Sequence, residues 1–304
     1  MQSEEGVAKV KKIIILIISF FTSISLYSYE IKDNFLHDSF GNSIELKKYN
    51  RMVIIDLAVV ETIFMLNGEE CIAGIVKNSQ SKVWPYEKTE NLASVGTPHK
   101  PSFEKIISLE PDLVILNEGS ALASSLKELN IPFIFHNSLK SPDTILESIK
   151  IFGVLLNKEN NADILYNESW KKLKNIKEKE KINPLNLKGM IVYSASPLVS
   201  FSNKYLPGKA LTYMGVENIA GDLTGNMPII SSEHILAKNL DVIIVSKNVG
   251  GVEELLKVNP LLSETKAAKE KNIIVFDAID FLRGSPRLFE TMEVLYKQLS
   301  EIKK

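Results

Sequence analysis

Residues Ser102 to Leu116, SFEKIISLEPDLVIL, decide the fold because Ser231 to Val245, SSEHILAKNLDVIIV, repeats them without a gap. The two stretches agree at four paired positions, which are Ser102 and Ser231, Glu104 and Glu233, Ile106 and Ile235, and Asp112 and Asp241. Each begins with a serine that can cap a helix, places an acid in the first turn and ends in a strand-like apolar run. One αβ unit used twice predicts two lobes of the same kind with a cleft between them. Chance similarity between two amphipathic units is the alternative.

The composition is that of an ordinary globular protein. At 304 residues the chain has room for two domains, each with its own core. Its 36 Lys and Arg residues nearly balance 37 Asp and Glu residues, so the net charge is -1. A chain without basic excess is unsuited to binding a phosphate backbone, and we expect no nucleic-acid partner.

The first 28 residues have the layout of a secretory signal peptide preceded by extra N-terminal residues. Lys9, Lys11 and Lys12 precede the apolar run Ile13 to Phe21, and we expect cleavage near Ser25 or Ser28. The run is shorter than the roughly 20 apolar residues that span a bilayer comfortably, which disfavours the alternative of a retained membrane anchor. The sequence therefore predicts a periplasmic protein.

The single cysteine, Cys71, lies far from the cleavage site. A lipoprotein needs a cysteine at that site, so the mature protein should be unlipidated. One cysteine also excludes an internal disulfide and any metal site built from a cysteine cluster. We expect Cys71 to be a small core residue.

Strand-like and helix-like segments alternate along the mature chain, which favours parallel sheets covered by helices. We place the first lobe at 29–141, a helical region at 142–182 and the second lobe at 183–304. Ser141-Pro142-Asp143 is a strong helix start, and a second helix from about Glu159 to Lys181 would be about 35 Å long. A helix of that length can cross from lobe to lobe, which predicts small hinge motion.

The chain resembles the helical-backbone class of periplasmic substrate-binding proteins, which serve ABC importers of ferric siderophores, haem and cobalamin. The resemblance runs from about Arg51 to the end, and its order and spacing are more specific than any single motif. Its motifs are Arg51-Met52-Val53-Ile54 with Glu61 beyond, Val95-Gly96, Phe103-Glu104-Lys105-Ile106, Pro111-Asp112-Leu113-Val114-Ile115, Gly215-Val216-Glu217-Asn218-Ile219-Ala220, Ser232-Glu233 and Gly284-Ser285-Pro286-Arg287. It implies two Rossmann-like α/β lobes with central, mostly parallel sheets joined by one long backbone helix, and a monomer without catalytic activity.

The resemblance also implies partners. A metal chelate, most consistent with a ferric siderophore-type complex, would be the transported ligand, with no tightly bound cofactor. An ABC permease dimer with its ATPase subunits would receive it, and in the family one glutamate on each lobe meets arginines of the permease. Glu104 and Glu233 stand at the matching positions. Their alternative role is to complement the helix dipole, worth about 0.3 to 1 kcal/mol.

Loops at the carboxyl ends of the strands should line the cleft. Lys100, Lys204 and Arg283 are the candidate contacts to an anionic chelate, each with the alternative of an ordinary surface cation. We expect Arg287 to be structural. Flat apolar walls are available from Trp84, Tyr86, Phe201, Tyr205 and Phe281, with Phe201 also a candidate core residue.

Two residues are candidates for direct metal ligation. His99 is the only histidine in a predicted cleft loop, although a lone histidine is more often a polar loop residue. Met227 is either a soft ligand to haem iron or an apolar contact. Pro98, Asn117 and Met227 stand where cobalamin binders tend to have Trp, and Thr97 stands where many haem binders have Tyr. Cobalamin is disfavoured, whereas haem and nickel or cobalt chelates remain alternatives.

An enzyme is the competing class, because two Rossmann-like lobes also describe many transferases. The sequence has no phosphate-binding glycine loop, nucleophile elbow or paired histidine and carboxylate at catalytic spacing. A structural or adhesive surface protein is the third possibility.

Overall fold

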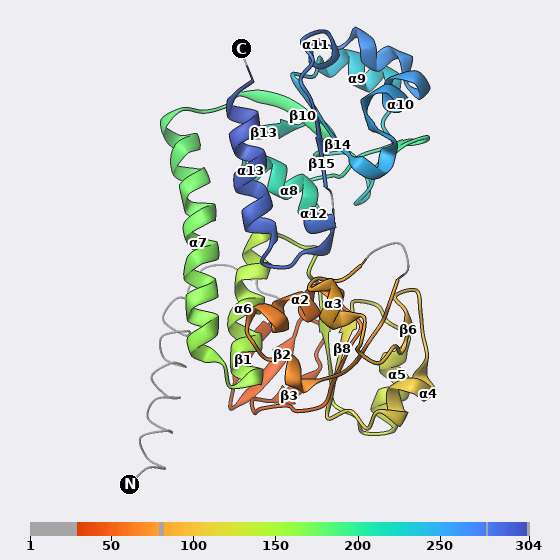
Figure 1. The fold of residues 1–304 in the computed structure, drawn as a ribbon, viewed down its shortest axis with the longest axis vertical. Coiled ribbons are helices and arrows are strands. Elements are labelled where there is room, and N and C mark those ends of the chain that lie inside the picture. Colours follow the sequence, from red (N-terminus) through yellow and green to blue (C-terminus); the bar gives the residue numbers. More distant parts are fainter. Residues whose placement is uncertain (1–28, 79–81, 278, 303–304) are drawn as a thin grey trace.

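The computed structural model describes residues 29–78, 82–277 and 279–302, so the predicted signal peptide lies outside the described residues. Figure 1 shows two α/β lobes along the long axis, with helix α7 (Glu159–Ile182) running beside them from one lobe to the other. Among the described residues, no helix has the length and apolar character needed to cross a membrane. The predicted fold class of two α/β lobes is confirmed.

The first lobe is built on a four-stranded parallel sheet in the order β5-β4-β8-β9. A three-stranded antiparallel sheet, β1-β2-β3, precedes it, and the Phe135 amide of β9 donates a 2.9 Å hydrogen bond to Asp38, the last residue of β2. The strands are β1 (Tyr29–Lys32), β2 (Phe35–Asp38), β3 (Ser43–Glu45), β4 (Met52–Ile54), β5 (Ile72–Ile75), β6 (Gly96–Thr97), β7 (Lys100–Pro101), β8 (Leu113–Asn117) and β9 (Phe133–His136). The helices are α2 (Leu57–Met65), η1 (Glu69–Cys71), α3 (Tyr86–Thr89), α4 (Phe103–Ser108) and α5 (Leu122–Glu128).

The second lobe has a parallel sheet of the same form, in the order β13-β10-β14-β15. Its strands are β10 (Leu187–Val192), β11 (Ser194–Ala195), β12 (Leu198–Val199), β13 (Val216–Asn218), β14 (Val242–Ser246) and β15 (Ile273–Phe276). Its helices are α8 (Leu206–Tyr213), α9 (Ser232–Lys238), η2 (Lys247–Val249), α10 (Gly251–Val258), η3 (Pro260–Glu264), α11 (Lys266–Lys269) and α12 (Ile279–Arg283). In each four-stranded sheet the strand that comes first in the sequence, β4 or β10, is central. The second strand of that sheet lies on one side of it and the third on the other.

The repeated αβ unit is confirmed in its hydrogen bonds. Ser102 accepts a bond from the Lys105 amide at 3.3 Å, and Ser231 accepts one from the His234 amide at 3.2 Å, so each serine caps its helix. The paired aspartates make a second shared contact, because each binds the start of the neighbouring central strand. Asp112 accepts from the Arg51 amide at 2.9 Å, and Asp241 accepts from the Lys188 amide at 2.8 Å.

Three helices connect the lobes. The predicted helix start at Ser141 is confirmed as a capping box with Thr144 that begins α6 (Pro142–Leu156). Helix α7 packs on α6 and also on α13 (Leu288–Ser300), with Tyr296 donating a 2.9 Å hydrogen bond to Glu180. The long helix is therefore held along its length by its neighbours, as helices of low mean hydropathy require.

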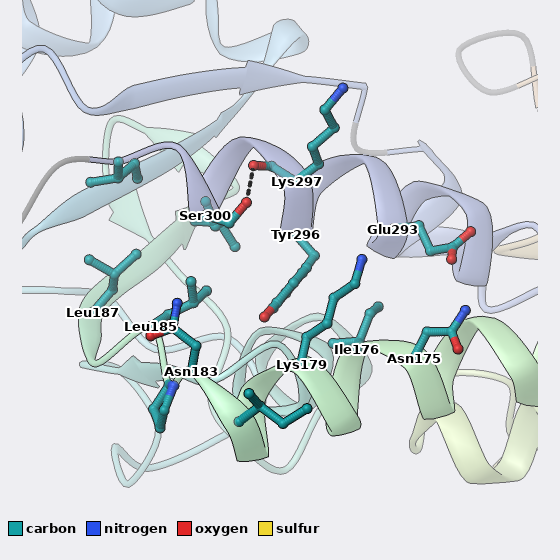
Figure 2. A pocket seen from close by; sticks show the side chains of 14 residues that line it. Asn175, Ile176, Lys179, Asn183, Leu185, Leu187, Glu293, Tyr296, Lys297 and Ser300 are labelled. Carbon is teal, nitrogen blue, oxygen red and sulfur yellow. Dashed lines mark hydrogen bonds between the residues drawn. The ribbon is translucent and has the colours of Figure 1, made fainter.

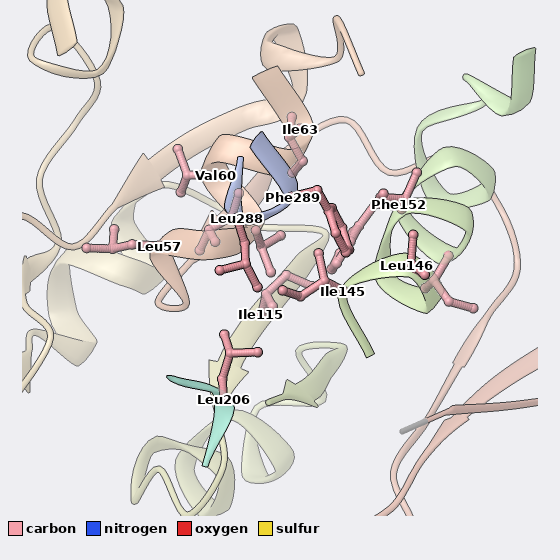
Figure 3. Close-up of a cluster of buried hydrophobic side chains, with 14 of the residues drawn as sticks. Leu57, Val60, Ile63, Ile115, Ile145, Leu146, Phe152, Leu206, Leu288 and Phe289 are labelled. Carbon is pink, nitrogen blue, oxygen red and sulfur yellow. The ribbon is translucent and has the colours of Figure 1, made fainter. Parts of the chain in front are cut away.

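Side chains from distant parts of the sequence share one apolar core. Figure 3 shows Ile63 and Phe152 of the first lobe and α6 packed with Leu206, Leu288 and Phe289, which follow α7 in the chain. Phe289 is 1% exposed. A second, smaller cluster of buried side chains, which includes Met190 and Ile243, lies within the second lobe alone.

Two helices of the structure lie in segments whose composition predicts loops. The Gly/Pro/Asn-rich region from Ser194 to Pro228 contains α8, which tolerates Pro207 because proline in the first turn of a helix lacks only an amide that has no partner there. The segment ending at Arg283, expected as a loop, forms the short helix α12.

Candidate functional site

A buried carboxylate joins the two lobes. Glu61 lies in α2 of the first lobe and is 0% exposed. The Ser285 hydroxyl donates to it at 2.6 Å, and the guanidinium groups of Arg283 and Arg287 lie 3.3 Å and 3.6 Å from its oxygens. We call these four residues the junction cluster. Because the other three lie from the last residue of α12 to the residue before α13, the cluster links α2 to the end of the second lobe.

In the junction cluster, burial and the neighbouring polar groups shift the pKa of the Glu61 carboxyl in opposite directions. Burial raises the pKa of the Glu61 carboxyl, whereas the Ser285 hydrogen bond, the charges of Arg283 and Arg287 and the Trp84 amide each lower this pKa. The Trp84 amide donates to Glu61 at 3.3 Å, and the Arg287 guanidinium lies 5.5 Å from the centre of the Trp84 ring. A buried ion pair is stable only when its polar groups have partners of this kind.

A glycine allows the two lobes to approach at this point. Gly284 has φ of +76°, and a Cβ added there would lie 2.3 Å from the Ser138 carbonyl oxygen. Only glycine fits this combination of a left-handed backbone and close backbone contact. The Gly284-Ser285 step of the family-like motif therefore positions Ser285 against the first lobe.

Arg283, predicted as a ligand contact, lies in this junction. Its side chain is 10% exposed, and besides Glu61 it binds the Lys82 carbonyl oxygen at 3.0 Å. Arg287, expected to be structural, also pairs with Asp280 at 2.8 Å. The other candidate cations, Lys100 and Lys204, are exposed.

The predicted aromatic walls divide into accessible and buried rings. Tyr86, in α3, is 41% exposed, and Trp84 and Tyr205 are half-buried. Phe281 is 0% exposed and packs on Phe276 with ring centres 5.3 Å apart, so as a ligand wall it was wrongly assigned. Phe201 is 2% exposed, which confirms the alternative that it belongs to the core.

Tyr205 lies where the second lobe meets the first. The Leu206 amide, next along the chain, donates a 2.9 Å hydrogen bond to the Leu139 carbonyl after β9. Burial raises the pKa of the Tyr205 hydroxyl, and the charges of Tyr193 and Asp56 raise it further. Asp56 caps α2 at the carboxyl end of β4. The hydrogen bond from Leu206 to Leu139 therefore places Tyr205 beside the first lobe.

The two candidate metal ligands are accessible. His99 and Lys100 are exposed in the β6–β7 hairpin, where the Lys100 amide donates to Thr97 Oγ1 at 3.2 Å. Met227 is 38% exposed. Over the residues that the structure describes, no group of three or more His, Cys, Asp or Glu side chains is placed to hold a metal ion. Direct ligation by His99 would therefore need donors from the ligand itself.

Glu104 and Glu233 have matching surroundings in the two lobes. Both are exposed in the first turn of a helix, α4 and α9. For each, a hydrogen bond from its own backbone amide lowers the pKa of the carboxyl, and the capping serine lowers it further. Ser102 donates to Glu104 at 3.0 Å. Both positions therefore carry an ionised, solvent-facing carboxylate.

Two hollows among the described residues lie away from the predicted ligand contacts. One of about 530 Å³ is bordered by α7, α13 and the start of β10, with Ile176, Lys179 and Tyr296 around it (Figure 2). Another of about 270 Å³ lies beside α9 and includes Asn218 and His234. Neither contains a predicted ligand contact, so enclosed volume alone does not identify the site.

The comparisons with known proteins decide the family. The family described as periplasmic binding protein matches residues 52–279. This chain belongs to the periplasmic binding protein family. Members of that family bind substrates for transport, so this binding protein is not an enzyme.

Individual relatives agree with the family. The uncharacterized ABC transporter substrate-binding lipoprotein YvrC of Bacillus subtilis (strain 168) is 25% identical to this binding protein over 275 residues, 87% of this chain and 84% of YvrC. Ferric-anguibactin-binding protein FatB of Vibrio anguillarum is 26% identical over 268 residues, 80% and 79% of the two chains. The apo structure of the periplasmic heme-binding protein RhuT from Roseiflexus sp. RS-1 superposes with a TM-score of 0.72 at 22% identity, covering 83% of this chain and 98% of that one.

Glu61 and Tyr193 are not among the site residues expected from the sequence. Glu61 is an acid inside the apolar helix LAVVETIFM, and a lone charge in such a stretch indicates a buried ion pair. Tyr193 follows β10 directly and is 46% exposed, although it comes at the end of a buried strand. The sequence shows that both residues are unusual for their positions, but it does not show which residues they contact in the fold.

Proposed function

We propose that this binding protein is the solute-binding component of an ABC importer and carries a metal chelate between its two lobes to the permease. The match to the periplasmic binding protein family over residues 52–279 carries the proposal. The similarity to FatB, named for a ferric siderophore, favours a ferric siderophore-type complex as the ligand. The protein acts as a monomer beside a permease dimer and its ATPase subunits.

The ligand contacts that we propose come from both lobes. Tyr86 and Trp84 form an apolar wall on the first lobe, and Tyr205 and Met227 face them from the second. Exposed Lys100 attracts a negatively charged chelate, and Arg283 supports this side of the site from the junction cluster. A cation favours encounter with an anionic ligand even where it remains solvated.

A haem or another metal complex, such as a nickel or cobalt chelate, is the second candidate ligand. The exposed thioether of Met227 and the exposed imidazole of His99 favour it, because both are side chains that complete the coordination of a chelated metal. In that case His99→Ala changes the absorption spectrum of the bound complex. In the siderophore case the iron is already enclosed, and the same change leaves the spectrum unaltered.

Docking to the permease is assigned to Glu104 and Glu233. They are exposed, ionised and related by the repeat, so a permease made of two like halves would meet one carboxylate per lobe with matching cationic sites. Neither carboxylate takes part in the junction cluster. Docking and ligand binding are therefore separable by mutation.

We further propose that the protein is periplasmic, released by a signal peptide and unlipidated. YvrC is a lipoprotein, so the point needs a direct test. The only cysteine, Cys71, is 2% exposed and ends η1 inside the first lobe, where it cannot be an acylated N-terminus. Mass spectrometry of the secreted protein should find an unmodified N-terminus between Leu26 and Glu30. An acylated or uncleaved chain contradicts this.

The experiment that tests the proposed function uses the purified mature protein. Its absorption spectrum and native mass reveal any co-purified haem or ferric chelate, and thermal unfolding is then followed with a panel of ferric siderophores, hemin and cyanocobalamin. A ligand at 100 times its dissociation constant stabilises by about 2.7 kcal/mol. A transition that no chelate raises would contradict the proposal and favour a structural role.

A further inference from the structure

Three short segments of the second lobe form an antiparallel ribbon. β11 pairs with β12, and β12 continues through a bridge between Val199 and Ile229. The hydrogen bonds on both sides of that bridge keep the same register, from the Ile230 amide to the Leu198 carbonyl at 2.9 Å and from the Ser200 amide to the Pro228 carbonyl at 3.1 Å. The segment 226–230 is therefore the third strand of this ribbon.

The two faces of the ribbon differ in burial. Residues opposite each other on antiparallel strands lie on the same face, and faces alternate along each strand. Leu198 and Ile230 share the inner face, which is buried in the second lobe at 6% and 4% exposure. The outer face holds Val199 and Ile229, and two residues further on Met227. Ile229 is 68% exposed and Met227 38%.

Aromatic rings extend this outer face. Phe201 lies opposite Met227 and is covered by two tyrosines, with Tyr205 stacked 5.9 Å away and Tyr193 edge-on at 5.5 Å. Tyr193 is itself 46% exposed. We call Tyr193, Met227 and Ile229 with the partly covered Val199 and Tyr205 the apolar platform. No side chain in it carries a formal charge.

The apolar platform leads to the junction of the lobes. Its Tyr205 end lies beside the contact between Leu206 and Leu139, and the charge of Asp56 at the carboxyl end of β4 acts on the Tyr205 hydroxyl. Tyr193, Met227 and Ile229 are all exposed, and exposed apolar side chains that gather in one place are a mark of binding sites. A ligand on the Tyr205 end of the platform would therefore lie beside the line where the lobes meet.

We propose that the apolar platform selects chelates with a flat apolar face, such as aryl catecholates or macrocycles, over compact polar chelates such as ferric citrate. The inference rests on the proposed function and specifies its ligand class. Rings and thioethers gain by covering aromatic or macrocyclic surface. A small hydrophilic chelate would leave Ile229 and Met227 in water and gain nothing from them.

The test compares three probes by fluorescence titration on the full mature chain: ferric citrate, a ferric chelate with three dihydroxybenzoyl groups, and hemin. Ile229→Gln and Met227→Gln remove apolar surface without changing charge. Ile164→Gln is the matched control, since Ile164 lies on α7 and is 60% exposed. Thermal unfolding of each variant checks the fold, and Ile229→Ala provides a milder second change.

We expect the aryl chelate or hemin to bind more tightly than ferric citrate. Each platform glutamine should weaken that binding about tenfold or more, with Ile164→Gln unchanged. Chelate binding that both platform variants and Ile229→Ala leave unchanged, or preferred binding of ferric citrate, overturns the platform and leaves the proposed function standing. Failure to bind any of the three probes, or any chelate of the wider panel, removes the proposed function and this inference with it.

Discussion

The Ser285 hydroxyl donates a 2.6 Å hydrogen bond to the Glu61 carboxylate, across 224 positions of sequence. This bond joins α2 in the first lobe to the connection between α12 and α13. Arg283 and Arg287 approach the same carboxylate. The spacing of the lobes at this point is therefore fixed by one acid, one hydroxyl donor and two guanidinium cations.

Glu61→Ala should lower the free energy of unfolding by about 3 kcal/mol, because it removes the acid paired with the largely buried Arg283 guanidinium, whereas Arg287 keeps its pair with Asp280. Urea unfolding measures this directly. Glu69→Ala is the matched control, since Glu69 pairs with Lys88 at 2.8 Å on the surface. An exposed pair contributes about 1 kcal/mol or less. If Glu61→Ala proves no more harmful than Glu69→Ala, the junction cluster does not hold the lobes together.

Asp112→Ala and Asp241→Ala should each cost about 1 to 2 kcal/mol of unfolding free energy, since each aspartate binds the backbone amide at the start of a central strand. The two sites lie in different lobes, so the double variant should lose close to the sum of the single losses, provided that unfolding is two-state. A large loss of stability at one aspartate and none at the other would show that the two lobes share the geometry of this contact but not its contribution to stability.

Glu104→Ala and Glu233→Ala should reduce uptake of the identified chelate by cells carrying the permease, while its affinity for the isolated protein stays unchanged. The residual uptake of each single variant should be more sensitive to salt, because charge complementarity acts on encounter. Glu128→Ala, at another exposed acid on α5, serves as the control. Normal uptake by the folded, ligand-competent double variant leaves these glutamates with helix capping alone.

Stability should fall as the pH drops below about 6.5, the ordinary pKa of histidine. His136 is buried, and burial lowers the pKa of its imidazole. Below pH 6.5 the unfolded chain binds a proton at His136 that the folded chain does not, so this contribution to the loss is at most about 1.4 kcal/mol per pH unit. His136→Gln should flatten the pH dependence of chemical unfolding. Equal slopes for wild type and His136→Gln would contradict the assignment.

The parallel sheets were predictable because their signals are local. Leu113 to Leu116 and Ile273 to Phe276 are short apolar runs bounded by polar residues, and both are strands. The helix beginning at Pro142 was equally clear from its cap. By contrast, α8 begins among glycine, proline and asparagine residues. It is helical because Leu206 and Leu211 pack into the core, which no local pattern reveals.

The site was predictable only in part. Loops at strand ends supplied the exposed candidates Tyr86, Lys100 and Met227, since the end of a parallel strand can be read from the sequence. The environment of Arg283 could not be read in this way, because its acid, Glu61, is far away along the chain. The apolar platform depends on a strand pairing between Val199 and Ile229 that has no hydrophobic alternation long enough to recognise.

Leu288 and Phe289 pack among Ile63, Ile145 and Phe152 (Figure 3). The core of the first lobe can therefore be completed only after the end of the chain has been synthesised. A chain emerges from its N-terminus, so the first lobe is made long before Phe289 exists. Until then its core has a vacant place lined by aliphatic and aromatic side chains, and it remains an incomplete, loosely packed intermediate. Because the first lobe cannot finish packing before its final helix is made, the chain can still be threaded as an extended polypeptide until then.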